Sequence, residues 1–165
     1  MKKLLFAGLA IAAGAAHAQP LQGLSPDEVS QYLSGAGMGY AKAAELNHSP
    51  GPMHVLELGE RLGLSNEQRA ATKQLMDAHK AEARAIGAKL VEAERALEQL
   101  FSKESVDQRT LAEGVRKAAA LRGEYRLSHL ETHRRMRALL TAEQVKRYDE
   151  LRGYSSERPA HPHRH

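Results

Sequence analysis

Three histidines and one methionine have the spacing in this sequence that best suits metal binding. His129 and His133 are four residues apart, which places both imidazoles on one face of a helix, and Met136 follows about one turn later. His79, on an earlier stretch, would add a third imidazole if the two stretches pack together. Imidazoles bind Zn, Ni, Co or Cu, and a thioether, either from Met136 or from Met76 on the earlier stretch, favours the softer copper. We therefore predict a candidate site for a divalent transition metal at these four residues.

The same histidines have two other interpretations. His79 and His129 could be polar fillers of a narrow seam between helices, bonded to each other or to water, with His133 exposed. They could also titrate and so respond to pH. His161, His163 and His165 alternate at the end of the chain, where they form either a weak chelating tail or a solvated one.

Catalytic signatures are absent from the sequence. In the segment from His129 to His133 the glutamate is Glu131, whereas a zinc-protease helix needs it directly after the first histidine. The chain has no cysteine, which the zinc deaminases require, and no Gly-x-Ser-x-Gly elbow. We therefore expect no enzyme and no required cofactor.

Arginines are spread along the two long helical stretches among alanines and leucines. Charged helical faces usually serve only to solvate the helix. Alternatively, long arginine stems can cover apolar surface while their heads contact acidic segments of another polypeptide. On that interpretation Arg122, Arg126 and Arg134 are candidate client-binding residues. The net charge is only +4 and no basic arm with interleaved aromatics is present, so we expect no nucleic-acid partner.

Heptad spacing predicts the elements that must position these side chains. From residue 66 to about 101 there is no proline, and apolar or small residues recur at alternating steps of four and three. A second stretch, 106–139, has the same spacing and follows an apparent capping box from Ser105 to Gln108. The two predicted seams contain Thr72, Met76, His79, Ala83, Ile86, Leu90, Ala93, Leu97 and Leu100, and Leu111, Val115, Ala118, Arg122, Tyr125, His129, Thr132, Met136 and Leu139.

The short link between the two stretches makes them antiparallel neighbours. With the turn near Glu104, His79 lies level with His129, and Leu64 lies level with Gln144. Shorter helices are expected at 25–34, 40–46, 53–62 and 142–153. The predicted fold is therefore all-α, a long antiparallel helical hairpin with short flanking helices.

Two nearly identical pentapeptides stand at helix starts, 76 residues apart. In each, a hydroxyl can accept from a free backbone N–H of the first turn, and a glutamine three residues later can reach back to the cap residue. The capping residues are Leu64, Ser65 and Gln68 in the first copy and Leu140, Thr141 and Gln144 in the second.

These paired boxes resemble the LTxxQ motif of the periplasmic Spy/CpxP family, which includes the metal-sensor relatives CnrX and ZraP. The resemblance covers about residues 54–153. It implies an all-α homodimer that acts as an ATP-independent chaperone for unfolded or partner proteins of the envelope, or regulates an envelope-stress sensor. The alternative it implies is a heavy-metal sensor or resistance protein. That branch carries a His-x-x-x-Met pair before the second box, whereas here Thr132 stands four residues before Met136.

The amino terminus has the features of an export signal. Lys2 and Lys3 precede an apolar stretch, and Ala16-His17-Ala18 supplies a small-x-small cleavage site. The apolar stretch is too short to span a bilayer comfortably, and no later segment is long enough. We predict a cleaved signal peptide at 1–18, a periplasmic product without a membrane span, and three further regions. These are a Gly/Pro-rich segment with short helices at 19–53, the LTxxQ hairpin domain at 54–154, and a disordered His-rich tail at 155–165.

Overall fold

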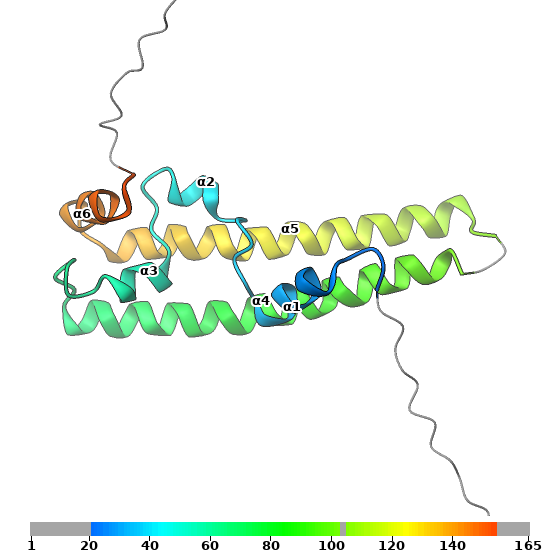
Figure 1. Ribbon diagram of the computed structural model, residues 1–165, viewed down its shortest axis with the longest axis horizontal. Coiled ribbons are helices and arrows are strands. Elements are labelled where there is room, and N and C mark those ends of the chain that lie inside the picture. The colour runs from blue at the N-terminus through cyan, green and yellow to red at the C-terminus, as the bar shows by residue number, and fades with distance from the viewer. Residues whose placement is uncertain (1–20, 103–104, 155–165) are drawn as a thin grey trace, which may run out of the picture.

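The computed structural model describes residues 21–102 and 105–154, and every regular element in that part of the chain is a helix. The two longest, α4 (Asn66–Leu100) and α5 (Gln108–Leu139), run antiparallel along each other as a hairpin (Figure 1). The predicted all-α hairpin is therefore confirmed. The expected signal peptide and His-rich tail lie outside the described residues.

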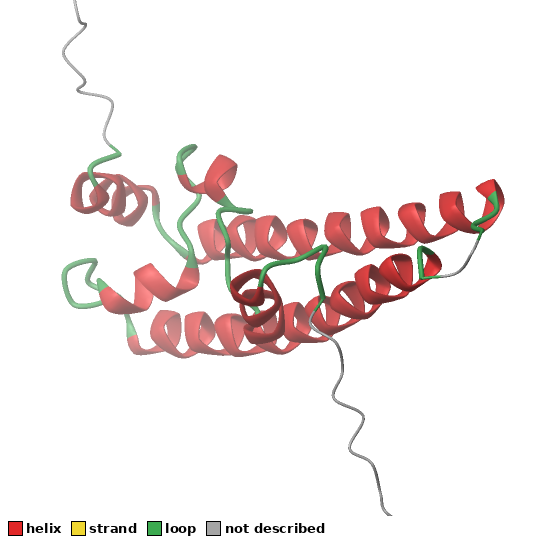
Figure 2. Cartoon of the chain, turned by 45° about the vertical axis from the view of Figure 1, so that its right-hand side comes forward, coloured by secondary structure: helices red, strands yellow, loops and turns green. Residues whose placement is uncertain are grey.

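Four short helices flank the hairpin: α1 (Pro26–Ser34), α2 (Lys42–Glu45), α3 (Pro52–Glu57) and α6 (Ala142–Arg152). Helix α1 packs against α4, α2 packs against α5, and α3 contacts both long helices. The loops between these short helices cross the hairpin on one side (Figure 2). Two of the helices are shorter than expected, because residues 58–63 form turns that end at Gly63 in the left-handed region, and α2 has no side-chain cap.

Side-chain caps fix where most of these helices begin. Ser25, Ser65 and Thr141 each form a complete capping box with the residue three positions later. The box expected at Ser105 is wrong: the N-cap is Asp107, whose Oδ1 accepts from the backbone N–H of Thr110 at 3.0 Å. A carboxylate is a strong N-cap and its charge suits the positive helix end, so α5 starts two residues later than predicted.

The core is divided into two clusters along the hairpin. One gathers around the middle of the long helices and includes Leu24, Tyr32, Leu90, Val91 and Tyr125. The other lies at the end that carries the two boxes; it consists of Val55, Leu62, Leu75, Met136, Leu140, Val145 and Tyr148. The amino-terminal helices therefore supply part of each cluster instead of forming a separate core.

Some buried positions on α4 differ from the predicted seam, because the amino-terminal helices pack on this helix as well. Leu75, Gly87 and Val91 are buried although they lie outside it, because α3 and α1 cover a second face of α4. On α5, Val115 is 48% exposed and Arg122 is exposed, although both were placed in the seam. A heptad pattern reports only the face that meets the partner helix, so it could not show a face covered by short helices.

Candidate functional site

The predicted register brings two imidazoles of the long helices into contact. His79 Nε2 and His129 Nδ1 are 3.0 Å apart, with the rings edge to face. The His129 ring also lies against Tyr125, with centroids 4.8 Å apart. The outer nitrogens, His79 Nδ1 and His129 Nε2, are buried and have no hydrogen-bond partner. This pair is therefore only half satisfied by the protein.

Burial keeps this pair uncharged. It lowers the pKa of His79, and it lowers the pKa of His129 to about 4, with smaller contributions from the neighbouring imidazoles of His79 and His133. Two neutral imidazoles share one proton in their hydrogen bond, so one outer nitrogen carries an N–H and the other a lone pair. Neutral imidazole is the form that binds metal.

The other two predicted metal ligands are used differently. His133 Nδ1 is 2.8 Å from the carbonyl oxygen of Ser49, and its ring packs so tightly on Gly51 that a Cβ there would lie 2.9 Å away. Met136 is fully buried in the cluster at the box end. Within residues 21–102 and 105–154, no three His, Cys, Asp or Glu side chains are grouped to hold a metal ion. Of these four residues, only His79 and His129 contact each other through a hydrogen bond, and His133 lies nearby.

A pocket of about 480 Å³ lies beside this pair, between the segment 35–54 and the two long helices. Four histidines line it, namely His54, His79, His129 and His133, and so do three methionines, Met38, Met53 and Met76. Its volume is within the usual range for small-ligand sites. Sequence reasoning missed His54, Met38 and Met53, because the loop that carries Met38 and the short helix α3 that carries Met53 and His54 show no periodicity that would place them against the hairpin.

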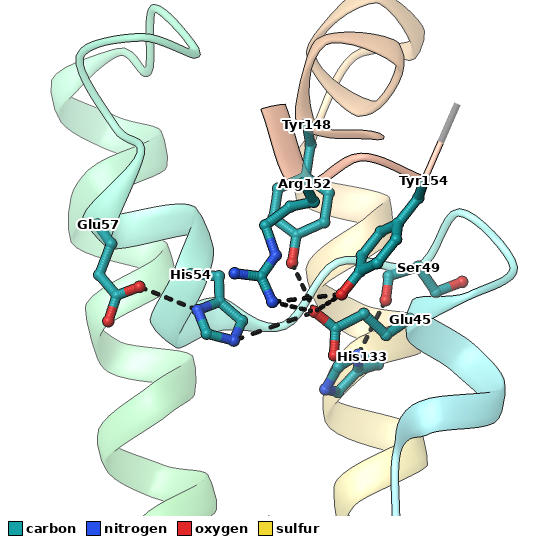
Figure 3. A network of polar contacts seen from close by, with 8 residues as sticks. All are labelled: Glu45, Ser49, His54, Glu57, His133, Tyr148, Arg152 and Tyr154. Atoms are coloured by element: carbon teal, nitrogen blue, oxygen red, sulfur yellow. Dashed lines mark hydrogen bonds and ion pairs between the residues drawn. The ribbon is translucent and has the colours of Figure 1, made fainter. Parts of the chain in front are cut away.

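A polar network centred on Glu45 closes one end of this region (Figure 3). Its Oε1 accepts from Tyr148 Oη at 3.1 Å, from Arg152 Nη2 at 3.2 Å and from Tyr154 Oη at 3.2 Å. His54 Nε2 lies 4.0 Å from the same oxygen. These contacts join α2 and α3 to α6, so Glu45 connects the amino-terminal segment to the end of the hairpin.

The two LTxxQ-like boxes contact each other directly. Gln68 Nε2 donates to Gln144 Oε1 at 2.8 Å, and Gln144 Nε2 donates back to Gln68 Oε1 at 2.9 Å. Gln68 Nε2 also donates to the carbonyl of Leu139 at 2.9 Å. Each glutamine thus caps its own helix through its oxygen and crosses to the other box through its nitrogen. The spacing predicted the caps, and the predicted hairpin register placed the two boxes near each other. It did not predict this pair of amide hydrogen bonds.

A shallow groove of about 420 Å³ runs between the long helices, away from the histidines. Leu97, Val115 and Ala118 give it apolar walls, and Arg122 and Arg126 lie along it. Arg122 is bound to Glu94 at 2.7 Å. The third predicted client-binding residue, Arg134, lies outside this groove and forms two short hydrogen bonds with Glu131.

Comparison with known proteins gives one family match. The model of the LTXXQ motif family protein matches residues 52–152, which include α3 to α6 and both boxes. No curated protein and no solved structure matches the chain significantly. In the described part of the chain, no helix is both long enough and apolar enough to cross a membrane.

Proposed function

This chain belongs to the LTXXQ motif family, the family of Spy/CpxP-type proteins, and we propose that it is a non-enzymatic envelope-stress protein of the periplasm. In this proposal it binds partly unfolded or partner polypeptides without ATP. It acts as a homodimer, either as a chaperone or as a regulator of a stress sensor. Analytical ultracentrifugation tests whether the protein is a dimer, and cell fractionation tests whether it is located in the periplasm.

The groove between α4 and α5 is the observation that carries this proposal. Its apolar walls, with Val115 48% exposed, suit the apolar side chains of an unfolded segment. Arg122 and Arg126 add positive charge along the same surface. The Arg122 side chain remains 49% exposed in its ion pair with Glu94, so its guanidinium can also contact an acidic group of a client.

Aggregation of a denatured client, followed by light scattering without ATP, tests the proposal. We expect the protein to suppress aggregation at near-stoichiometric amounts. Replacing both Arg122 and Arg126 with glutamine should weaken suppression. Arg147→Gln is the control, because that exposed arginine lies on α6 and pairs with Glu150 outside the groove. No suppression of several clients by folded protein would contradict the proposal.

A second candidate function is metal-responsive binding in the envelope. It is favoured by the His79–His129 pair, whose outer nitrogens are buried without partners. An orphaned buried nitrogen is costly, and a metal ion can satisfy the one that carries a lone pair.

Calorimetric titration with Zn, Ni, Co and Cu(II) tests this second function. The tail histidines His161, His163 and His165 are replaced by asparagine in every sample, so that tail chelation does not contribute. Binding of one ion per chain or per dimer that is lost in a His129→Ala, His133→Ala double variant supports it. Unchanged binding in that variant shows that these histidines are packing residues.

A further inference from the structure

Methionine is concentrated at the pocket between the segment 35–54 and the hairpin. The described part of the chain contains four methionines, and three of them, Met38, Met53 and Met76, line this pocket. The fourth, Met136, is buried in the cluster at the box end. The three come from a loop, from α3 and from α4, so folding gathers them from separate elements.

The pocket that these methionines line is also lined by the histidine pair. His79 and His129 line the same pocket, and their outer nitrogens have no protein partner. One of the two carries a lone pair in the neutral pair. Thioether sulfur and neutral imidazole are the ligand types that bind Cu(I).

The same surroundings disfavour harder ions. In residues 21–102 and 105–154, no third His, Cys, Asp or Glu side chain is grouped with the histidine pair so as to hold a metal ion. Glu45, the carboxylate at the pocket, already accepts from Tyr148, Arg152 and Tyr154. Zn²⁺ typically takes three or four nitrogen, sulfur or oxygen ligands from the protein, and thioethers are poor ligands for it.

Methionine side chains are also able to adjust to an ion. Met is unbranched and has three rotatable bonds, so it changes rotamer at low cost. Met53 is 50% exposed and Met76 is half-buried, so neither is fixed by dense packing. Both side chains line the same pocket as the histidine pair.

We propose that this pocket binds one monovalent copper ion through thioethers of Met38, Met53 and Met76 together with an outer nitrogen of His79 or His129. This inference rests on the second proposed function, metal-responsive binding, and specifies both the ion and the ligands. It differs from the site predicted from sequence, because Met136 is left out and Met38 and Met53 join Met76, which the sequence had offered as the alternative thioether.

Nuclear magnetic resonance of methionine methyl groups tests the assignment residue by residue. The protein is labelled with carbon-13 at the methionine methyl groups and titrated with Ag(I), a redox-stable substitute for Cu(I). We expect the signals of Met38, Met53 and Met76 to shift with saturation at one ion per chain, while the Met136 signal stays in place. Unshifted pocket methionines, or a shift of Met136 alone, would overturn the proposal.

Competition for Cu(I) with a chromogenic chelator under anaerobic conditions gives the affinity. Replacing the three pocket methionines with leucine should weaken Cu(I) binding by at least about tenfold, since loss of outer-shell contacts alone costs a metal site about 10–100-fold. Met136→Leu is the control and should bind as the wild type does. All proteins carry the asparagine-substituted tail, and circular dichroism establishes that each is folded.

The experiments distinguish failure of the metal-binding function from failure of the methionine site. If the leucine variant keeps its Cu(I) affinity, the methionine site is wrong whatever the calorimetry shows. If Zn, Ni, Co and Cu(II) fail to bind while Cu(I) binding depends on the pocket methionines, the pocket assignment stands. In that case the metal-binding function is restricted to monovalent copper.

Discussion

At the scale of single residues, the His79–His129 pair is the main polar feature of the hairpin interior. Two neutral rings share one hydrogen bond, and the pair carries two buried nitrogens that the protein leaves unsatisfied. Such a pair costs stability that a purely apolar layer would not. These unsatisfied nitrogen atoms are the basis of the metal hypothesis, because a bound ion would satisfy the one that carries a lone pair.

Acid should destabilise the metal-free protein through this pair. In the unfolded chain the pKa of a histidine is about 6.5, whereas burial lowers the pKa of His129 to about 4. The unfolded state therefore takes up a proton first, and the free energy of unfolding decreases as pH falls from about 6.5 to about 4, by an amount on the order of 2–3 kcal/mol. Urea unfolding at a series of pH values measures this.

Two variants separate this contribution from other acid effects. His129→Gln should flatten the pH dependence in that interval, even if it changes stability overall. His48→Gln is the control, since the His48 side chain is 57% exposed and pairs with Asp149 on α6, and not with His79 or His129. Capping carboxylates such as Glu28 and Asp107, whose pKa values are lowered by their hydrogen bonds, lose their contribution only at lower pH. An unchanged slope in His129→Gln would contradict the assignment.

At the scale of elements, close backbone approach decides how α1 lies on α4. Gly87 sits where a Cβ would collide with the carbonyl oxygen of Tyr32 near the end of α1. Glycine normally weakens a helix interior by about 0.5–1 kcal/mol relative to alanine. Its presence at the centre of α4 is therefore explained by packing and not by helix propensity.

Gly87→Ala should reduce the free energy of unfolding by about 1–3 kcal/mol, because α1 must move away from α4. Gly123→Ala is the matched control on α5, since no atom lies within 4 Å of a Cβ built there. That change should instead stabilise the protein by about 0.5–1 kcal/mol through helix propensity. Equal effects at both positions in thermal unfolding would show that the close approach of Tyr32 is unimportant.

The amide pair between the boxes gives a second prediction at this scale. Gln68→Glu keeps an oxygen able to cap α4 but removes the nitrogen that donates to Gln144 and to the Leu139 carbonyl. Loss of these bonds should cost about 1–2 kcal/mol. Gln74→Glu introduces the same charge at an exposed position of α4 and should change stability by less than about 0.5 kcal/mol. Chemical denaturation measures the free energy of unfolding of both variants. An equal decrease in the two would contradict a stabilising role for the Gln68–Gln144 pair.

The elements also show how far the sequence alone can predict this structure. Heptad spacing predicted that His79 and His129 lie side by side, and capping chemistry predicted that helices begin after Ser65 and Thr141. Both are local rules. The packing of α1 and α3 on α4 was not predictable, since it depends on contacts such as Gly87 with Tyr32 between distant residues. For that reason the pocket, which needs both parts of the chain, was not foreseen.

At the scale of the whole molecule, the amino-terminal segment with α1 to α3 connects the hairpin to the carboxy-terminal helix α6. It packs on the hairpin through α1 to α3 and reaches α6 through the Glu45 network (Figures 1 and 3). The same segment forms one wall of the methionine and histidine pocket. We therefore expect the stability of this attachment to influence the shape of the pocket.

Glu45→Ala should loosen this attachment without unfolding the hairpin. The change leaves the hydroxyl of the fully buried Tyr148 and the guanidinium of Arg152 without their shared acceptor, which costs about 1–3 kcal/mol locally. We expect amide hydrogen exchange to accelerate in α2 and α3, while the centres of α4 and α5 keep their protection, because segments open locally with their own free energies. Glu57→Ala is the control, since that carboxylate is 59% exposed and pairs with His54 and not with α6 among the described residues. If exchange in α2 is equal in the two variants, Glu45 does not hold the segment. If it rises only in Glu45→Ala, the pocket is formed by a segment that opens separately from the hairpin.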